Sequence, residues 1–208
     1  MDPLKRMADF QIDVLKEVGN IGAGNAATAL AKLLNKQVDM KVPLVRIVSF
    51  QDVAESLGGA EEVVVAIFLR VSGEAPGNMF FILSIPSAKK LLGGLAGIRS
   101  EDPDSFTEME RSALQEIGNI MVGSYLTSLS DFTRLHLVPT VPSLAIDMSG
   151  AILSFGVMEY GQTGDKALLI DTKFKEGELE VEGHFTYIPD PQSFQKIFSA
   201  LGVPFDDQ

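Results

Sequence analysis

The sequence predicts an α+β fold made of two copies of one unit. The stretch DVLKEVGNIGAGNAATAL (13–30) returns in altered form as SALQEIGNIMVGSYLTSL (112–129), 99 residues later. Each copy continues into pairs of apolar segments joined by short turns such as SGEAPG and KEGE, which favour antiparallel strands. Because the offset drifts to 103 farther along, loop insertions separate the copies, and we expect one domain (1–208) with repeats at about 9–97 and 106–203.

Each copy begins with a long helix, expected from about Asp9 to Asn35 and from about Thr107 to Leu135. In both stretches apolar residues recur at steps of three and four, which is the pattern of a helix with one buried side. Thr107 and Glu110 have the spacing of a capping box, which marks the start of the second helix.

The remaining elements follow in the same order in both copies. Strand-like segments follow Pro43 and Pro142, and short helical pieces come next at QDVAESL (51–57) and GAILSFGVMEY (150–160). Two apolar strands then complete each copy, at 63–71 and 78–85 and at 167–174 and 180–188. A closing helix is expected after Pro86 and within DPQSFQKIFSALG (190–202), and the seam lies in GIRSEDPDSF (97–106).

Composition narrows the class of protein. The 208 residues are 46% hydrophobic and 22% charged, as in a soluble globular chain. No apolar run reaches the roughly 18 residues of a membrane span, the N-terminus MDPLKRMADF lacks the features of a signal peptide, and there is no cysteine. We therefore expect a cytoplasmic protein without a membrane span. The net charge of −11 argues against nucleic-acid binding, which needs clustered Lys and Arg.

The glycine-rich stretch GNIGAG (19–24) raises the question of a phosphate-binding loop. It has neither the GxGxxG order nor the Walker A pattern, and the second copy has Met121 where the first has Gly22. A glycine inside a helix costs about 0.5–1 kcal/mol relative to alanine. We therefore expect these glycines to let the two motif helices pack closely or to form a flat docking face.

Polar residues of the repeated phrase share one side of each helix. At about 100° per residue, Asp13, Glu17 and Asn20 fall within an arc of roughly 60° and about 10 Å of helix length. The second copy has the same spacing, with Ser112, Glu116 and Asn119.

A solvated helix face is the ordinary explanation of such a pattern. Other surface positions diverge between the copies, however: Lys16 becomes Gln115 and Asn25 becomes Ser124, whereas the Glu and the Asn are kept. We therefore interpret the Glu/Asn pair as a functional site.

A Glu and an Asn without a general base suit few reactions. His136 and His184 lie elsewhere in the sequence, lack metal-ligand spacing and are expected at the surface or at a sheet edge; GxSxG and HExxH motifs are absent. A carboxamide does not take up a proton at neutral pH, but it can orient a water molecule. Hydrolysis of an already labile phosphoryl group fits best, because positioning counts there for more than base strength.

These residues resemble the signature of the CheC/CheX/FliY family of chemotaxis phosphatases: Asp or Ser, three residues, Glu, two residues, Asn, 22 residues, Pro. The first copy matches with Asp13, Glu17, Asn20 and Pro43. The second copy matches with Ser112, Glu116, Asn119 and Pro142. Two motifs are similar to CheC-type members, whereas CheX-like members carry one and FliY-like members continue into a switch domain, for which no residues remain after Gln208.

The resemblance implies that the protein hydrolyses the phospho-aspartate of CheY, the chemotaxis response regulator. It assigns alignment of the attacking water to Asn20 and Asn119, and contact with the active-site lysine of the receiver domain to Glu17 and Glu116. The supporting positions are Asp13 and Ser112, which orient or cap the site, and Pro43 and Pro142, which are structural.

The resemblance also implies a fold, a cofactor source and partners. The fold is a pseudo-two-fold α/β sandwich with a continuous, mostly antiparallel sheet and both motif helices along one face. Mg²⁺ belongs to the receiver domain, so we expect no cofactor and no metal of the protein's own. CheD, a receptor deamidase, is an expected second partner, and two fused motifs make a monomer the default.

Two other functions stay open at this level. The protein could be a binding module for phosphorylated CheY, or a regulator of CheD, that hydrolyses little; or it could be a structural flagellar protein. Both Glu/Asn pairs are intact, which favours the enzyme. Because the residues at positions 22 and 25 differ from those at 121 and 124, beside the two Asn residues, we predict unequal activity of the two sites.

Overall fold

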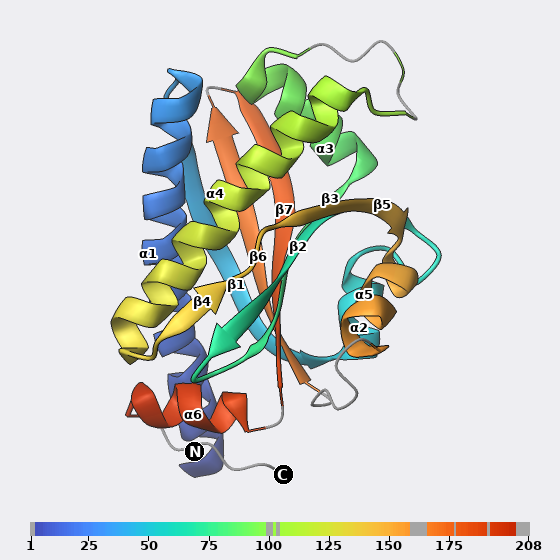
Figure 1. Ribbon diagram of the computed structural model, residues 1–208. Coiled ribbons are helices and arrows are strands. Elements are labelled where there is room, and N and C mark those ends of the chain that lie inside the picture. The colour runs from blue at the N-terminus through green and yellow to red at the C-terminus, as the bar shows by residue number, and fades with distance from the viewer. Residues whose placement is uncertain are drawn as a thin grey trace.

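The computed structural model describes residues 3–98, 102, 105–158, 166–176, 178–190 and 192–202 (Figure 1). The same order of elements, a long helix, an edge strand, a short helix, a hairpin and a closing helix, occurs twice along the chain. The elements are α1 (Pro3–Leu34), β1 (Asp39–Ser49), α2 (Phe50–Ser56), β2 (Val63–Gly73), β3 (Gly77–Ser84), α3 (Ile85–Leu91), η1 (Leu92–Ala96), α4 (Glu108–Thr133), β4 (Leu137–Pro139), β5 (Ser143–Met148), α5 (Ser149–Met158), β6 (Lys166–Glu176), β7 (Leu179–Pro189) and α6 (Ser193–Ala200).

All strands belong to one antiparallel sheet of order β1-β6-β7-β3-β2-β4, with β5 also paired to β2. The two halves exchange their edge strands: β1 pairs with β6 of the second hairpin, and β4 and β5 pair with β2 of the first. The β3–β7 pairing joins the two hairpins at the centre. This continuous sheet confirms the predicted α+β class, whereas the exact repeat boundaries stay a sequence prediction.

Helices α1 and α4 lie side by side across one face of the sheet (Figure 1). The larger apolar core fills the space beneath them, and it includes Leu30 of α1, Val122 of α4, and Phe81 and Phe185 of the sheet. A smaller core on the opposite face lies beneath α2 and α5; its members include Val53, Phe80, Ile82, Ile152 and Leu153. Each layer therefore combines residues from both halves of the chain.

The predicted elements are present, with shifts at their ends. Helix α1 begins at Pro3 rather than near Asp9, because proline is favoured in the first turn of a helix, where its missing N–H is not needed. The predicted capping box is confirmed: Thr107 Oγ1 accepts from the Glu110 N–H, and Glu110 Oε2 accepts from the Thr107 N–H. Strand β3 ends at Ser84, because Ser84 caps helix α3.

Strand β1 departs most from the prediction. It begins at Asp39, so Pro43 lies inside the strand rather than before it. The expected helical piece at 150–160 is present as α5, although Glu159 and Tyr160 lie outside the described residues. Half of the predicted seam at 97–106, namely residues 99–101, 103 and 104, also lies outside them.

Candidate functional site

Helices α1 and α4 pack closely because a small residue of one copy lies against a large residue of the other. A Cβ atom on Gly22 would lie 3.0–3.2 Å from atoms of Tyr125, so the first copy is small where the second is large. At the equivalent positions α4 has Met121 where α1 has Gly22, and Tyr125 where α1 has Ala26. The predicted role of the glycines in helix packing is thus confirmed at Gly22.

Tyr125 also joins the helix layer to the sheet. Its hydroxyl oxygen lies 3.1 Å from Thr172 Oγ1 of β6, and its ring stacks on Phe185 of β7 with 4.5 Å between centroids. Burial raises the pKa of Tyr125 to about 12, since the phenolate would lose its hydration there. The two motif helices are therefore held in a fixed relation to each other and to the strands below.

The other motif glycines divide into two classes. A Cβ on Gly118 would lie 2.5–2.7 Å from side-chain atoms of the buried Ile67 in β2, so α4 lies close against the sheet at this point. Gly24 and Gly123, in contrast, have nothing within 4 Å of an added Cβ. The fold does not require glycine at these two positions, each of which is four residues after a motif Asn.

Every predicted polar motif residue lies on the outer side of its helix. In α1, Leu15 and Val18 are buried, whereas the motif residues between and beside them are exposed. The same alternation holds in α4, where Leu114 and Ile117 are buried. The exposed set comprises Asp13, Glu17 and Asn20 in α1 and Ser112, Glu116 and Asn119 in α4. The prediction of a single polar face on each motif helix is confirmed.

The strand around Pro43 brings a backbone donor next to Asn20, the Asn that lies 23 positions earlier in the first motif. From Lys41 to Leu44, three steps along β1 face two along β6, so β1 contains a bulge around Pro43. Proline cannot donate to the ladder, and beside it the Val42 N–H donates to Asn20 Oδ1 at 3.3 Å. The Val42 side chain is buried and would lie 3.5 Å from a Cβ on Gly19. The bulge thus supplies a backbone donor that fixes the amide of Asn20.

Pro142 lies in a similar irregularity but makes a different contact. Val71 pairs with Pro139 and Phe68 with Ser143, so the strand pair contains one extra residue between β4 and β5. Here Gln115 Nε2 donates to the Pro142 carbonyl at 2.9 Å. Within the described part of the chain, Asn119 has no hydrogen bond equivalent to that of Asn20. Sequence reasoning identified both prolines but missed Val42 and Gln115; the constant spacing of 22 residues between Asn and Pro was the available signal.

The histidines lie away from the motifs. His136 is exposed just before the edge strand β4, as expected. His184 is on β7, an interior strand, so it is not at a sheet edge, but its side chain is 25% exposed at the surface, and its Nδ1 lies 2.8 Å from Asp171 Oδ1. Among the described residues there is no group of three or more His, Asp or Glu side chains that could hold a metal ion.

The motif residues lie on an open helical surface. A cavity of about 870 Å³ is lined by other residues, namely Lys36, Gln37, Asp39, Met40, Lys41, Lys173, Lys175 and Glu180. Neither motif contributes to it or to the smaller cavities of about 420 and 300 Å³. Small-molecule substrates are usually enclosed by concave pockets. The Glu and the Asn of each motif are instead exposed on an open helix surface, which a macromolecule can approach.

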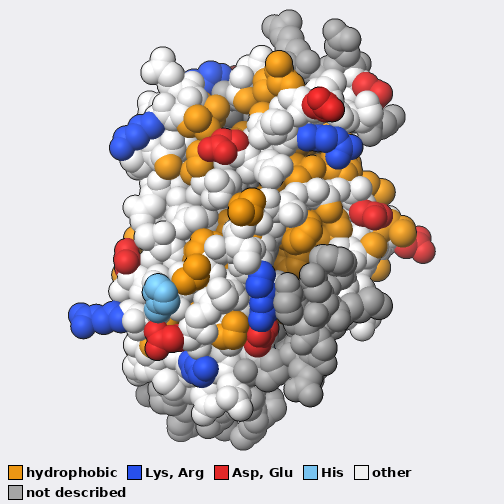
Figure 2. All heavy atoms as spheres, in the orientation of Figure 1, with side chains coloured by type: hydrophobic (Ala, Val, Ile, Leu, Met, Phe, Trp, Pro, Cys, Tyr) orange, Lys and Arg blue, Asp and Glu red, His pale blue; other side chains and the backbone are white. Residues whose placement is uncertain are grey.

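The side of the molecule that carries α4 is sparsely charged. Figure 2 shows scattered acidic and basic side chains there, with hydrophobic side chains reaching the surface over the N-terminal end of α4. No helix among the described residues is long and apolar enough to cross a bilayer.

Comparisons with known proteins agree with this geometry. The model of the CheC-like family matches residues 10–47 and 109–146, which contain both motifs. The CheY-P phosphatase CheC of Bacillus subtilis is 44% identical over 93% of this chain and 94% of its own length. The flagellar motor switch phosphatase FliY of the same organism is 31% identical over 69% of this chain and 35% of FliY.

Solved structures agree on the fold. The crystal structure of Thermotoga maritima FliY superposes with a TM-score of 0.70 at 19% identity, covering 97% of this chain and 98% of FliY. The chemotaxis protein CheX of Desulfovibrio desulfuricans gives a TM-score of 0.52 at 13% identity, covering 84% of this chain and 99% of CheX. The family match and the 44% identity to a full-length relative place the protein: it belongs to the CheC-like family.

Proposed function

We propose that the protein is a hydrolase that removes the phosphoryl group from the aspartyl phosphate of the response regulator CheY. The observation that carries this proposal is the pair of exposed Glu/Asn sets, presented twice on rigid helices rather than inside a pocket. The relative that is 44% identical is by name a CheY-P phosphatase. A protein substrate also agrees with the open form of the site, because only a partner with its own concave active site can enclose these side chains.

The reaction needs a positioned water and little else from this chain. The water oxygen bonds to phosphorus while the bond between phosphorus and the aspartate oxygen breaks. The products are the aspartate carboxylate and inorganic phosphate, which takes up the oxygen and the protons of the water. A carboxylate is a good leaving group, so the loose transition state requires alignment more than base strength. Asn20 and Asn119 supply that alignment through their amides, which donate and accept hydrogen bonds together.

Glu17 and Glu116 hold the partner in register. Each lies three residues before its Asn, less than one helical turn away, so both side chains of a site reach the same part of a docked receiver. A carboxylate there pairs with the lysine of the receiver's active site. Mg²⁺ is bound by the receiver and neutralises charge on the phosphoryl group, so the protein needs no metal of its own. Asp13 and Ser112, a further turn back, orient the docking surface.

The same proposal includes a setting and further partners. A phosphorylated chemotaxis regulator is a cytoplasmic protein, so we place the protein in the cytoplasm. We further propose CheD as a second partner, as the resemblance to CheC-type members implies, and we propose a monomer because one chain carries both sites. Size-exclusion chromatography with light scattering, with and without purified CheD, tests both statements.

The decisive experiment follows the decay of phosphorylated CheY. We expect wild type to accelerate decay, and the variant with Asn20→Ala and Asn119→Ala to lose about 100-fold of that acceleration, while still binding beryllofluoride-activated CheY. If wild type binds but does not accelerate decay, the protein is a binding module and the proposed hydrolase activity is wrong.

A further inference from the structure

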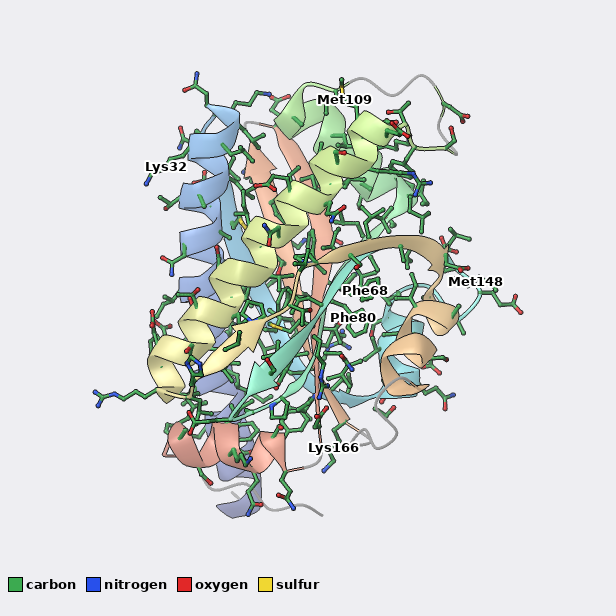
Figure 3. The ribbon with its side chains drawn as sticks, in the orientation of Figure 1. Lys32, Phe68, Phe80, Met109, Met148 and Lys166 are labelled. Carbon is green, nitrogen blue, oxygen red and sulfur yellow. The ribbon has the colours of Figure 1, made fainter. Side chains whose placement is uncertain are left out.

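An exposed apolar side chain precedes each motif. Phe10 of α1 is 55% exposed and Met109 of α4 is 69% exposed. They are 99 residues apart, so they occupy the same position in the two copies, three residues before Asp13 and Ser112. Figure 3 shows Met109 at the N-terminal end of α4, pointing away from the fold. Large apolar side chains that the fold leaves in water at equivalent places require a reason.

Both side chains lie on the motif side of their helices. At about 100° per residue, Phe10 is within about 55° of the centre of the arc formed by Asp13, Glu17 and Asn20. It is seven residues, or about 10 Å of helix, before Glu17. Because the copies are related by a constant offset, the same geometry holds for Met109 and Glu116. Each motif is thus continued toward the helix N-terminus by one apolar group.

The two motif helices also contain a matched pair of exposed apolar residues on the other side. Leu33 is 51% exposed and Phe132 is 44% exposed, and they too are 99 residues apart. Both lie about 165° from the centre of the motif arc. They provide controls of similar size and exposure on the same helices.

We propose that Phe10 and Met109 are apolar anchors that bind the phosphorylated receiver domain beside its active site. The inference rests on the proposed function, because the occupant is the same partner that Glu17 and Glu116 engage. Continuity with the motif identifies this occupant: a receiver whose lysine meets the Glu has its surface within about 10 Å of the anchor. The partner therefore presents an apolar spot next to its acidic, metal-binding pocket.

The other end of each motif agrees with close docking. Gly24 and Gly123 have open space where a Cβ would project, so a partner can approach the helix backbone there. The proposed contact surface on each helix therefore runs from an apolar anchor through the Glu and the Asn to a glycine. Buried aromatic and long apolar side chains are the groups that most often dominate binding energy at interfaces, whereas rim charges mainly affect association rates.

The test compares a variant carrying Phe10→Ala and Met109→Ala with one carrying Leu33→Ala and Phe132→Ala. We expect the anchor variant to bind beryllofluoride-activated CheY about tenfold more weakly, with KM for phosphorylated CheY raised similarly and kcat within about twofold of wild type. We expect the control variant to match wild type in binding and in KM. Thermal melts check that both variants are folded.

Three results separate the possible failures. Equal binding by wild type, anchor variant and control variant overturns the inference and leaves the proposed function intact. Absence of binding by wild type overturns the proposed function itself. Self-association of wild type that only the anchor variant abolishes assigns Phe10 and Met109 to a contact between copies of this chain, and it also overturns the inference.

Discussion

The two motif sites have the same Glu and Asn, but different contacts hold their helices to the sheet. In the first site Asn20 accepts a hydrogen bond from the Val42 N–H of the neighbouring strand. In the second site Gln115, one helical turn before Asn119, donates a hydrogen bond to the Pro142 carbonyl. Among the described residues, Asn119 itself has no bond equivalent to that of Asn20. The Glu and the Asn are thus the same in both copies, whereas the contacts that hold each helix to the sheet differ.

The same spacing between Asn and Pro in the two copies therefore does not ensure that the Asn side chain is fixed in the same way. Both copies keep 22 residues between the Asn and the proline, and both prolines lie where the strand has one extra residue. Only the first bulge directs a backbone donor at the Asn. A side chain fixed before the partner arrives loses less conformational freedom on docking, so the first site is better prepared.

The largest expected effect on activity comes from comparing Asn20→Ala with Asn119→Ala. A hydrogen bond of this kind is worth about 0.5–1.5 kcal/mol, so we expect the first site to turn over on the order of threefold faster than the second. Asn20→Ala should therefore remove the larger share of CheY dephosphorylation. Equal residual activity in the two single variants, with both folded, would contradict the link between the Val42 bond and catalysis.

Sequence reasoning went far for this fold because its signals are local. Thr107 and Glu110 predicted the start of α4, which the structure confirms. The helical period also placed the three polar residues of each motif on one exposed side of their helix. The exchange of edge strands could not be predicted, since β1 and β6 pair over more than a hundred residues of sequence. Nor could the Asn20–Val42 bond, because it depends on the bulge geometry at Pro43.

The largest expected effect on stability distinguishes Gly118 from Gly19, the first glycine of each motif. A Cβ on Gly118 would lie 2.5 Å from Ile67 Cγ1, whereas one on Gly19 would lie at an ordinary 3.5 Å from Val42 Cγ1. We expect Gly118→Ala to lower the free energy of unfolding by about 1–3 kcal/mol, and Gly19→Ala to be neutral or to raise it by up to about 1 kcal/mol. Urea denaturation measures both. Equal costs at the two positions would show that the copies pack alike.

A substitution at Tyr125 tests the packing of this large side chain of α4 against Gly22 of α1. Tyr125→Phe keeps the packing against Gly22 but removes the hydroxyl beside Thr172, so we expect a loss of about 1 kcal/mol at neutral pH. Burial raises the pKa of Tyr125 to about 12 from 10.0, so above pH 10 the folded chain keeps a proton that the unfolded chain loses. Stability should then fall as pH rises from about 10 to 12, and less steeply in the variant. Urea midpoints at pH 8 and pH 11 that change in parallel for both proteins would argue against this.

The smallest effect concerns the ends of the motif helices. Both helices stop at a residue with left-handed backbone, Asn35 at φ 50° after α1 and Arg134 at φ 57° after α4. Asparagine adopts this conformation at a lower energetic cost than arginine, so the end of α4 carries more backbone strain than the end of α1. We expect Arg134→Gly to raise the free energy of unfolding by about 0.5–1 kcal/mol and the melting temperature by about 1–4 °C. Asn35→Gly should change either value less. A larger gain at Asn35 than at Arg134 would contradict the prediction, because it would place the greater strain at the end of α1 rather than α4.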